Sequence, residues 1–478
     1  MYKKIIDSNR DEIIAMLQDL VSFESVQSDP LPDAPFGKGV NDVFHHMLDI
    51  GEKDGFDVVN VDNYGGHIEW PGIELSEDGS TEIAAKETLG IAVHLDVVPI
   101  GEGWSVDPLG GEIVEDKIYG RGTSDNKGAI CATYFAMKAL RETGFVPRKN
   151  IRLILGLDEE TGWVGMKKYL EKVDTPDFGY SPDAAFPVIN GEMGVLSFEI
   201  AKKLQPSHEK GLQLRSIDGG NADNMVPDWA KAIVFDETGK GYDKIKQAIE
   251  DFKKRTDYKI SGNVRGKAFE ISTKGISAHG AHPEKGLNAI SILMDFLGEL
   301  DFANESIKEY IDFYINHIAH EVDGKGLGVA MSDSLSGNLV LNVGVISVDK
   351  EVAILTINIR YPVSNSDEDV FDALRPLVDK YDFGIVKTKE MAPIYFAPDS
   401  EFVETLMSVY RENTGKEKAR PFVIGGGTYA RAIPNAVAFG PHFPHDKDVA
   451  HQKDEFQSIS SMMMAAHIYA DAIYKLTK

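Results

Sequence analysis

The spacing of hydrophobic residues predicts two kinds of structure along the chain. Near both ends, helical patterns alternate with short apolar runs such as residues 89–95 (LGIAVHL) and 151–157 (IRLILGL). These runs scarcely alternate between apolar and polar positions, which is typical of strands covered on both faces in a parallel sheet. Between them, residues 127–143 carry apolar side chains at helical spacing. We therefore predict an α/β domain with a mainly parallel sheet.

The middle of the chain has a different pattern. Strand candidates such as residues 339–345 and 354–360 alternate apolar with polar positions, which is typical of a sheet with one solvated face. From residue 267 to residue 389 the expected order is strand, helix, strand, strand, helix, strand, with one extra helix at 304–318. That is the order of a ferredoxin-like split βαβ unit. Residues 194–262 resemble a partial copy of it.

These patterns predict one α/β domain interrupted by an α+β domain. We assign residues 1–193 and 390–478 to the α/β domain, and residues 194–389 to the inserted domain, which is ferredoxin-like and partly duplicated. A chain of 478 residues can bury such cores without a disulfide or a metal ion as a staple.

Composition and charge exclude several classes of function. The chain has 50 basic and 76 acidic residues, and its net charge of −26 argues against non-specific binding to nucleic acid or an anionic membrane. No apolar run reaches the ~18 residues of a membrane span, and residues 1–26 resemble an amphipathic helix rather than a secretory signal. The single cysteine, Cys131, excludes an internal disulfide and a Cys-rich zinc site, and fits a reducing cytoplasm.

Histidines and carboxylates gather at the ends of predicted strands, where α/β sheets carry their binding sites. Because the chain lacks cysteine pairs, any metal ion must be bound by His, Asp or Glu. The segments are VHLDVVP (93–99), YGRGTSDNKG (119–128), LILGLDEETG (153–162), YSPDA (180–184) and DVAHQKDE (448–455).

Each segment alone also has an ordinary explanation. His94 and Asp96 stand two positions apart in an extended segment, so they face the same side and the carboxylate could orient the imidazole. Asp125 could simply cap the following helix. The acidic run at 158–160 could be a solvated loop, since adjacent carboxylates otherwise need a cation to offset their repulsion.

Several common catalytic motifs are absent from the chain. It has no GxxxxGK[ST] phosphate loop, no GxSxG nucleophile elbow and no HExxH zinc helix. The GGGT segment at 425–428 fits either an ordinary turn or a backbone nest for an anion.

In order and spacing, the five segments resemble the co-catalytic metallopeptidases that include aminoacylase, carnosinase and bacterial carboxypeptidase G. The resemblance covers essentially the whole chain. The long insert, with NMVPD (224–228), SAHGAHPEKG (277–286) and NIRYP (358–362), is most similar to the peptidase V branch of bacterial dipeptidases. The resemblance implies a three-layer, zinc-peptidase-like catalytic domain, with the insert as a lid domain.

The same resemblance implies two divalent metal ions per subunit, Zn or Mn. His94, Asp125 and Asp183 would bind one ion. Asp125 would bridge to the second ion, which Glu160 and His451 would complete. The family has a cis peptide after the bridging residue, which here would join Asp125 to Asn126. Three carboxylates and two imidazoles are hard or borderline ligands, which suit Zn²⁺, Mn²⁺ or Co²⁺.

The resemblance also assigns the catalytic groups. Glu159 would be the general base, and Asp96 would orient His94. From the insert, His279 would stabilise the oxyanion, with His282 as a nearby rival.

Further residues of the resemblance would bind the substrate. Asn224 and Arg360 would grip its C-terminal carboxylate, for which the bidentate geometry of arginine is well suited. The ordinary alternative for Arg360 is a surface arginine at a strand end. A further carboxylate-binding loop would contain Gly426, Gly427 and Thr428.

We therefore expect a dinuclear metal-dependent dipeptidase, which hydrolyses dipeptides that have a free N-terminus by means of metal-activated water. One alternative is an N-acyl amino acid deacylase, such as a succinyl-diaminopimelate desuccinylase, although these carry a simpler lid. The other is a non-catalytic relative that keeps the fold, which would be expected to have lost Glu159 or a ligand. We expect a cytoplasmic monomer, with a weak dimer as the alternative, that acts on small dipeptides without nucleic-acid or membrane partners.

Overall fold

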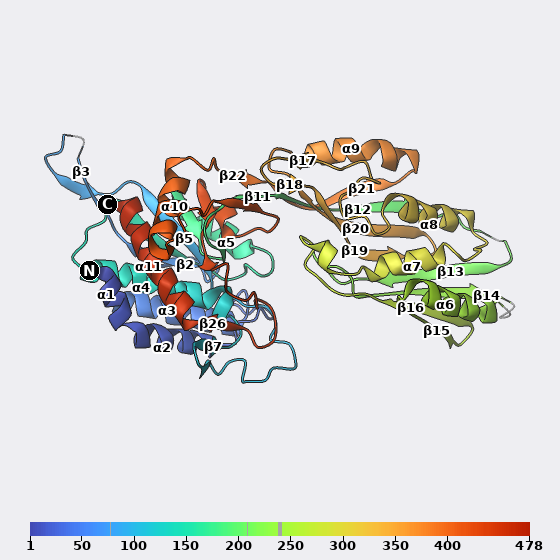
Figure 1. Cartoon of the computed structure of the whole chain (residues 1–478), viewed down its shortest axis with the longest axis horizontal. Helices are drawn as coiled ribbons and strands as arrows, with labels where there is room; N and C mark the ends of the chain where they lie inside the picture. Colours follow the sequence, from blue (N-terminus) through green and yellow to red (C-terminus); the bar gives the residue numbers. More distant parts are fainter. Residues whose placement is uncertain (77, 208, 238–240) are drawn as a thin grey trace. The chain divides into compact units, whose positions relative to one another are not determined.

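The computed structural model describes residues 1–76, 78–207, 209–237 and 241–478. The chain forms two compact units, whose elements are labelled in Figure 1. Unit 1 comprises Met1–Asn190, Phe396–Phe422 and Gly427–Lys478, and unit 2 comprises Gly191–Tyr395 and Val423–Gly426. The short segment Val423–Gly426 belongs with the insert, because the Met193 N–H donates to the Ile424 carbonyl oxygen at 2.8 Å.

The sheet of unit 1 has a parallel centre, as its hydrophobic pattern predicts, but its outer strands pair antiparallel. Strands β8, β5, β9 and β24 run parallel to one another, and β1 and β2 extend one edge antiparallel. The path through the sheet is β1 (Asp57–Asn60), β2 (Gly66–Trp70), β8 (Asn150–Gly156), β5 (Thr88–His94), β9 (Phe178–Ser181), β24 (Ala436–Ala438) and β11 (Ile189–Glu192).

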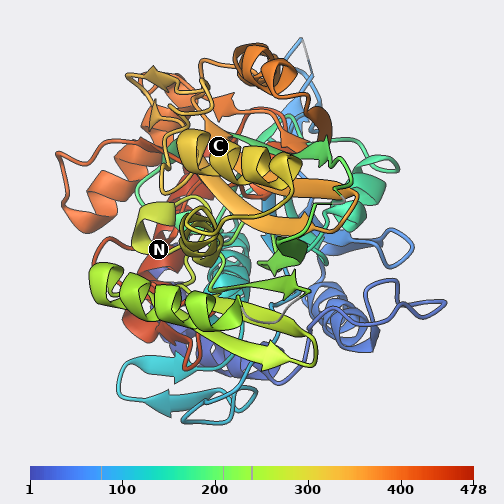
Figure 2. The same ribbon diagram turned by 90° about the vertical axis from the view of Figure 1, so that its right-hand side faces the viewer.

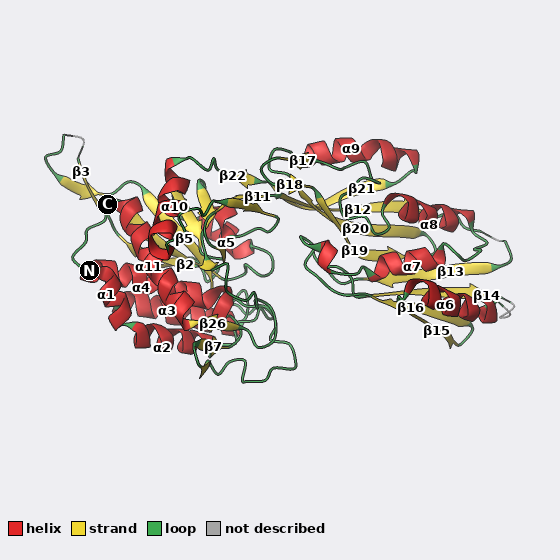
Figure 3. Ribbon diagram, viewed as in Figure 1, coloured by secondary structure: helices red, strands yellow, loops and turns green. Residues whose placement is uncertain are grey.

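Helices enclose this sheet and bury its central strands (Figure 3). All seven residues of β5 are buried, so both of its faces are covered. The helices of unit 1 are α1 (Tyr2–Ser8), α2 (Arg10–Val21), α3 (Lys38–Lys53), α4 (Gly128–Glu142), α5 (Val164–Leu170), α10 (Glu401–Thr414) and α11 (Ile459–Thr477). Short strands complete the unit: β3 (Ile73–Leu75), β4 (Glu82–Ala84), β6 (Glu112–Val114), β7 (Lys117–Tyr119), β10 (Ala184–Ala185), β25 (Pro441–His442) and β26 (Phe456–Ser458).

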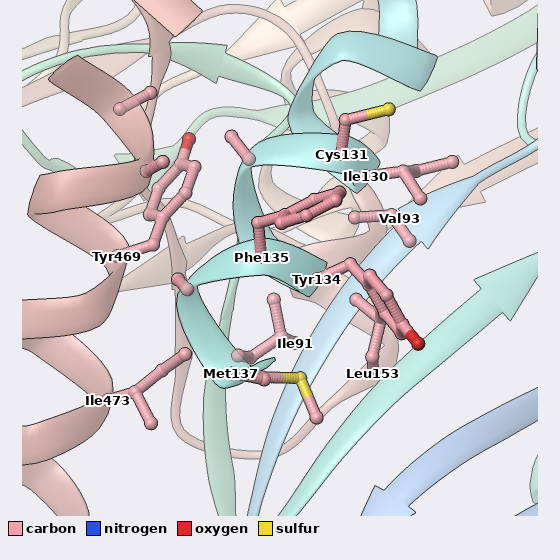
Figure 4. Packing of buried hydrophobic residues seen from close by; sticks show 14 of the residues in the cluster. Ile91, Val93, Ile130, Cys131, Tyr134, Phe135, Met137, Leu153, Tyr469 and Ile473 are labelled. Carbon is pink, nitrogen blue, oxygen red and sulfur yellow. The ribbon is translucent and has the colours of Figure 1, made fainter. Parts of the chain in front are cut away.

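Helix α4 lies between the sheet and α11 (Figure 4). Ile91 and Val93 of β5 and Leu153 of β8 belong to the same buried cluster as Phe135 of α4 and Ile473 of α11. A helix covered on both sides buries most of its surface, which explains why twelve of the fifteen residues of α4 are buried. The short helical turn Thr123–Lys127, which precedes α4 and carries Asp125, contacts β5.

Unit 2 is built on one antiparallel sheet of eight strands (Figure 2). Their order is β15 (Lys259–Arg265), β16 (Ala268–Lys274), β14 (Trp229–Asp236), β13 (Leu212–Gly219), β19 (Val340–Val348), β20 (Val352–Tyr361), β12 (Gly194–Lys203) and β21 (Gly384–Met391). The helices of the unit are α6 (Tyr242–Thr256), α7 (Ala289–Leu297), α8 (Glu305–His317) and α9 (Asp367–Lys380). Buried and part-exposed residues alternate along β14, so one face of the sheet is more open to solvent.

The strand order corrects the expected start of the split βαβ unit. The order β19-β20-β12-β21 is ferredoxin-like, with β12 as its first strand. The strand at 267, expected in that place, is β16, and it pairs with β14 and β15 instead. Sequence order suggested that the strand just before α7 is the first strand of the split βαβ unit. In the structure, the four strands between β12 and α7 form a separate group.

That group repeats the same arrangement. In the first group the ferredoxin-like order is β12, α8, β19, β20, α9 and β21. In the second group β14, α6, β15, β16 and α7 take the corresponding places, with the strand order β15-β16-β14-β13. Strand β13 has the position in this group that β21, the last strand, has in the other group, although β13 comes first among the four strands along the chain. The copy that the sequence suggested for 194–262 therefore runs from Leu212 at the start of β13 to Leu297 at the end of α7, and it excludes β12.

No helix in the described parts of the chain combines the length and the apolar surface needed to cross a membrane.

Candidate metal centre

Three adjacent parallel strands bring most of the predicted ligands together. His94 is the last residue of β5, which lies between β8 and β9. Glu159 and Glu160 follow β8, and Asp183 follows β9. Because the carboxyl ends of parallel strands meet at the same edge of a sheet, these side chains converge there. The local sequence sets their position, since each apolar strand ends where its polar residues begin.

Asp125 lies between two imidazoles. Its Oδ1 is 2.9 Å from Nε2 of His94, and its Oδ2 is 3.0 Å from Nε2 of His451. Asp183 Oδ1 lies 3.5 Å from Nε2 of His94, and Glu160 Oε1 lies 3.1 Å from Nε2 of His451. The centre thus consists of two groups of ligand atoms that share one carboxylate. The Asp125–Asn126 peptide bond is cis.

The hydrogen bonds of His94 leave its Nε2 facing only acceptors. Its Nδ1 lies 2.9 Å from the backbone oxygen of Asp96, which can only accept, so Nδ1 carries the proton. Nε2 then presents its lone pair to the carboxylates of Asp125 and Asp183. The Nε2 of His451 likewise faces the carboxylates of Asp125 and Glu160. Each of these positions requires a positive charge, which a proton or a metal ion supplies.

Burial and mutual repulsion act on the carboxylates. Burial, with the Asp183 carboxylate next in importance, raises the pKa of Glu159 well above its usual range. Burial, with Asp125 among the neighbouring charges, also raises the pKa of Glu160, and it raises that of Asp183 to about 7. A cluster of acids with raised pKa values stabilises a cation among them.

The imidazoles have the complementary shift. Burial alone would lower the pKa of His451, but its hydrogen bonds to Asp125 and Glu160 outweigh burial and raise it to about 11. Burial would likewise raise the pKa of Asp125, yet the hydrogen bonds from His451 and His94 hold it well below its usual range. The pKa of Asp125 therefore shifts in the opposite direction to those of Glu159, Glu160 and Asp183, which favours the charged form of Asp125.

Two sets of donor atoms are compact enough to hold a metal ion. His94, Glu159 and Asp183 form one set, and His94, Asp125 and Glu160 form the other, with the atoms of each set within 4.8 Å of one another. All are nitrogen or carboxylate donors, which suit a borderline or hard divalent cation. Both sets differ from the expected ones. Glu159, the expected base, is a donor in the first set in place of Asp125, and His94 is a donor in the second set in place of His451.

Asp96 connects the ends of two strands. Besides facing His94, its Oδ1 accepts the backbone N–H of Glu159 and its Oδ2 accepts that of Glu160, both at 3.1 Å. Its carboxylate is almost wholly buried. Asn126 holds Asp183 in a similar way, because its side-chain amide donates to Asp183 Oδ1 at 2.9 Å. The ligands are thus held by partners that are not ligands themselves.

Tyr429 is a part of the centre that the sequence analysis missed. Its buried ring lies edge-on to His94, at 6.4 Å between ring centroids, and to Trp163, at 5.0 Å. A Cβ added at Gly156 would lie 2.2 Å from Cε2 of Tyr429, so the ring occupies space that only a glycine leaves. The sequence offered one signal for this contact, because a glycine inside an apolar strand often marks a site where another group approaches the backbone closely.

The predicted residues of the insert lie together within unit 2. The N–H of Gly280 donates to the carbonyl oxygen of Asn224 at 2.6 Å, so the loops that carry Asn224 and His279 are joined. A Cβ on Gly425 would lie 3.4 Å from Ala281 and 3.9 Å from Cγ of Arg360. Arg360 is buried near the end of β20, and not at the surface as its ordinary alternative required.

The ring of His279 has a defined hydrogen-bond direction. The backbone N–H of Ala281 donates to Nδ1 of His279 at 3.2 Å, so the neutral ring carries its hydrogen on Nε2. His282 is 57% exposed in its side chain and lies near Glu284, with 3.4 Å between Nδ1 and Oε1. In the GGGT segment, Gly426 belongs to unit 2, whereas Thr428 belongs to unit 1 and accepts the N–H of Ala430 at 3.2 Å.

Comparisons with known proteins agree on one family. The model of the peptidase family M20/M25/M40 matches residues 90–475. A Staphylococcus epidermidis protein named "Putative dipeptidase" is 34% identical to this chain over 481 residues, covering 100% of this chain and 99% of its own. A Bacillus subtilis protein named "Putative dipeptidase YtjP" is also 34% identical, over 98% of both chains.

A solved structure has the same fold at low sequence identity. The aminoacylhistidine dipeptidase from Vibrio alginolyticus superimposes with a TM-score of 0.56 and 16% identity, covering 97% of this chain and 96% of its own.

Proposed function

The chain belongs to the peptidase family M20/M25/M40, and we propose that it is a dinuclear metal-dependent dipeptidase that acts on dipeptides with a free N-terminus. The comparisons confirm the family that the five motifs indicated. The observation that carries the proposal is the placement of Asp125, whose two oxygens face the Nε2 atoms of His94 and His451. The dipeptidase names of full-length relatives support the substrate class.

The proposed ligands divide into two sets. His94, Asp125 and Asp183 bind one ion, and Asp125, Glu160 and His451 bind the other. We propose Zn²⁺ or Mn²⁺, because the donors are imidazoles and carboxylates without thiolates. When bound, the two ions supply Lewis acidity that polarises the scissile carbonyl and makes the attacking water more acidic.

Glu159 is the proposed general base. It takes a proton from the water whose oxygen forms the new C–O bond with the peptide carbonyl carbon. It then delivers that proton to the amine, which leaves as the C–N bond breaks. Asp96 accepts the N–H of Glu159, and the carbonyl oxygen of Glu159 accepts the indole N–H of Trp163 at 2.9 Å. Both contacts hold the main chain of the base in place.

The proposal assigns substrate recognition to residues of unit 2. His279 donates from Nε2 to the developing oxyanion, which is supported by the hydrogen bond that its Nδ1 accepts. Asn224 and Arg360 bind the C-terminal carboxylate, and Gly426, Gly427 and Thr428 form a further carboxylate-binding loop. The two four-stranded groups in one sheet support a monomer, because one chain carries both. The single cysteine supports a cytoplasmic location.

A substrate panel tests this function against the deacylase alternative. We expect rapid hydrolysis of a free dipeptide, and rates lower by at least ~10²-fold for the N-acetyl amino acid and the C-terminally amidated dipeptide, because a buried polar site rejects a substrate that leaves its groups unpaired. The matching tetrapeptide should be a poor substrate. Light scattering during turnover reports whether the active species is a monomer. Faster hydrolysis of the N-acetyl substrate would favour the deacylase.

His279→Ala should lower kcat more than it raises KM. An oxyanion donor acts mainly in the transition state, and removing one commonly costs ~10²-fold or more in kcat. His282→Ala is the matched control, since its side chain is more exposed and is the alternative candidate. The assignment fails if His279→Ala changes KM alone, or if His282→Ala has the larger effect on kcat.

A further inference from the structure

Glu455 and Arg121 form a buried ion pair that the proposed mechanism does not use. Arg121 Nη1 lies 2.5 Å from Glu455 Oε2, and both side chains are almost wholly inaccessible. The guanidinium also donates to the carbonyl oxygens of Pro99, at 3.3 Å, and Ile100, at 3.2 Å. The pair thus joins the loop that follows β5 to the loop that precedes β26.

The other oxygen of Glu455 holds the main chain at Asp125. Oε1 of Glu455 accepts the backbone N–H of Ser124 at 3.0 Å and that of Asp125 at 3.2 Å. The N–H of Gly120 donates to the carbonyl oxygen of Glu455 at 2.9 Å. Because Glu455 lies in the same loop as His451, these bonds set the distance between two proposed ligands of one metal ion.

Asp96 makes the same kind of contact on the other side of the centre. Its carboxylate accepts the consecutive N–H groups of Glu159 and Glu160, both at 3.1 Å. Glu455 accepts the consecutive N–H groups of Ser124 and Asp125. Asp96 and Glu455, which are not proposed ligands, therefore hold the main chain at Glu160 and Asp125, the two carboxylates that flank His451. Removing partners of this kind typically costs about 10–100-fold in metal affinity or activity.

We propose that Glu455, paired with Arg121, is a positioning residue that sets the affinity of the centre for the metal ion bound by Asp125, Glu160 and His451. This inference rests on the proposed dinuclear function. The carboxylate of Glu455 is neutralised by the guanidinium of Arg121, so its effect on the metal ion arises from geometry and not from its charge. Glu455 acts through the main chain and does not contact the substrate.

The test is Glu455→Asp, which keeps the charge but shortens the side chain. The shorter acid cannot reach both Arg121 and the two N–H groups. Metal-free protein is titrated with Zn²⁺ alone against a chromophoric chelator. The parental protein should bind two ions, whereas the variant should bind the second ion at least ~10-fold more weakly. Its kcat should recover as the concentration of Zn²⁺ is raised, which a general loss of structure would not allow.

Glu69→Asp is the matched control. Glu69 forms a largely buried ion pair with Arg152 in the same unit, at 2.6 Å between Nε and Oε2, and the guanidinium also donates to the carbonyl oxygen of Asp174, which is not a proposed ligand. Its Zn²⁺ affinities should equal the parental values. Unchanged affinity in Glu455→Asp overturns the inference, and so does an equal loss in Glu69→Asp. A parental protein that binds no metal overturns both the inference and the proposed function.

Two neutral variants decide the matter if Glu455→Asp does not fold. Arg121→Met with Glu455→Gln removes both charges but keeps an amide oxygen that accepts the N–H groups. Arg121→Met with Glu455→Leu removes the acceptor as well, and leaves no buried charge without a partner. We expect the glutamine variant to bind the second Zn²⁺ ion at least ~10-fold more tightly than the leucine variant. Equal affinities overturn the inference.

Discussion

Replacing Glu159 by glutamine is expected to lower kcat by at least ~10²-fold while both metal ions remain bound. Glutamine keeps the size of the side chain and its main-chain bonds to Asp96 and Trp163. It cannot accept the proton of the attacking water. Burial and the Asp183 carboxylate raise the pKa of Glu159 well above its usual range, so this carboxylate holds a proton more strongly than an exposed glutamate does. The measurement is steady-state kinetics together with the metal content of the purified variant.

The neighbouring residue is the control for this prediction. Glu160→Gln should weaken the binding of one metal ion, because Oε1 of Glu160 lies 3.1 Å from Nε2 of His451, the other proposed ligand of that ion. Its activity should therefore rise when metal is added, whereas that of Glu159→Gln should not. Near-normal turnover of Glu159→Gln would show that another group accepts the proton, and loss of metal from it would make Glu159 a ligand.

Asp125→Asn is expected to have the largest effect, with turnover reduced by at least ~10³-fold. The two oxygens of Asp125 lie 2.9 and 3.0 Å from the Nε2 atoms of two different imidazoles, those of His94 and His451. In the Asp125→Asn variant, the side-chain amide would present an N–H group to one of the two imidazoles, and the negative charge at this position would be lost. A metal ion supplies several kcal/mol of transition-state stabilisation, and each ~1.4 kcal/mol is a factor of ten in rate.

Metal analysis and chelation check this second prediction. The variant should retain at most one ion per chain, and the parental protein should lose activity with a chelator and regain it with Zn²⁺ or Mn²⁺. Asp42→Asn is a suitable control, because Asp42 lies on α3 and forms an ion pair with the exposed Lys38. Two bound ions in Asp125→Asn, with turnover near the parental value, would contradict the bridging role.

The arrangement of the centre follows in part from local sequence. The apolar runs that form β5 and β8 are short and hardly alternate, which predicts buried parallel strands before any coordinates are known. Parallel strands place their carboxyl ends at one edge, so the polar residues that end each run must lie near one another. This reasoning picked out the segments that contain His94, Glu160 and Asp183, the family resemblance selected these residues within them, and the structure brings them together.

The sheet order of the insert did not follow from the sequence. Alternation shows that a segment is a strand with one exposed face, but it does not tell which strand is its neighbour. Strand β12 pairs with β20 and β21, more than a hundred residues further along the chain, and β16 pairs with β14 and β15. Such pairing depends on how whole faces pack, which no local pattern records.

The sequence by itself determined which side chains are candidates for the chemistry and at which ends of which strands they stand, because strand length, polarity and capping are local properties. Only the tertiary structure decided which oxygen of Asp125 faces which imidazole, that Tyr429 fills the space above Gly156, and that Glu455 holds a main chain 331 residues away at Ser124. These contacts join segments distant in sequence. Their distances are set by the packing of the sheet against α4 and α11, and that packing exists only once the whole core has formed.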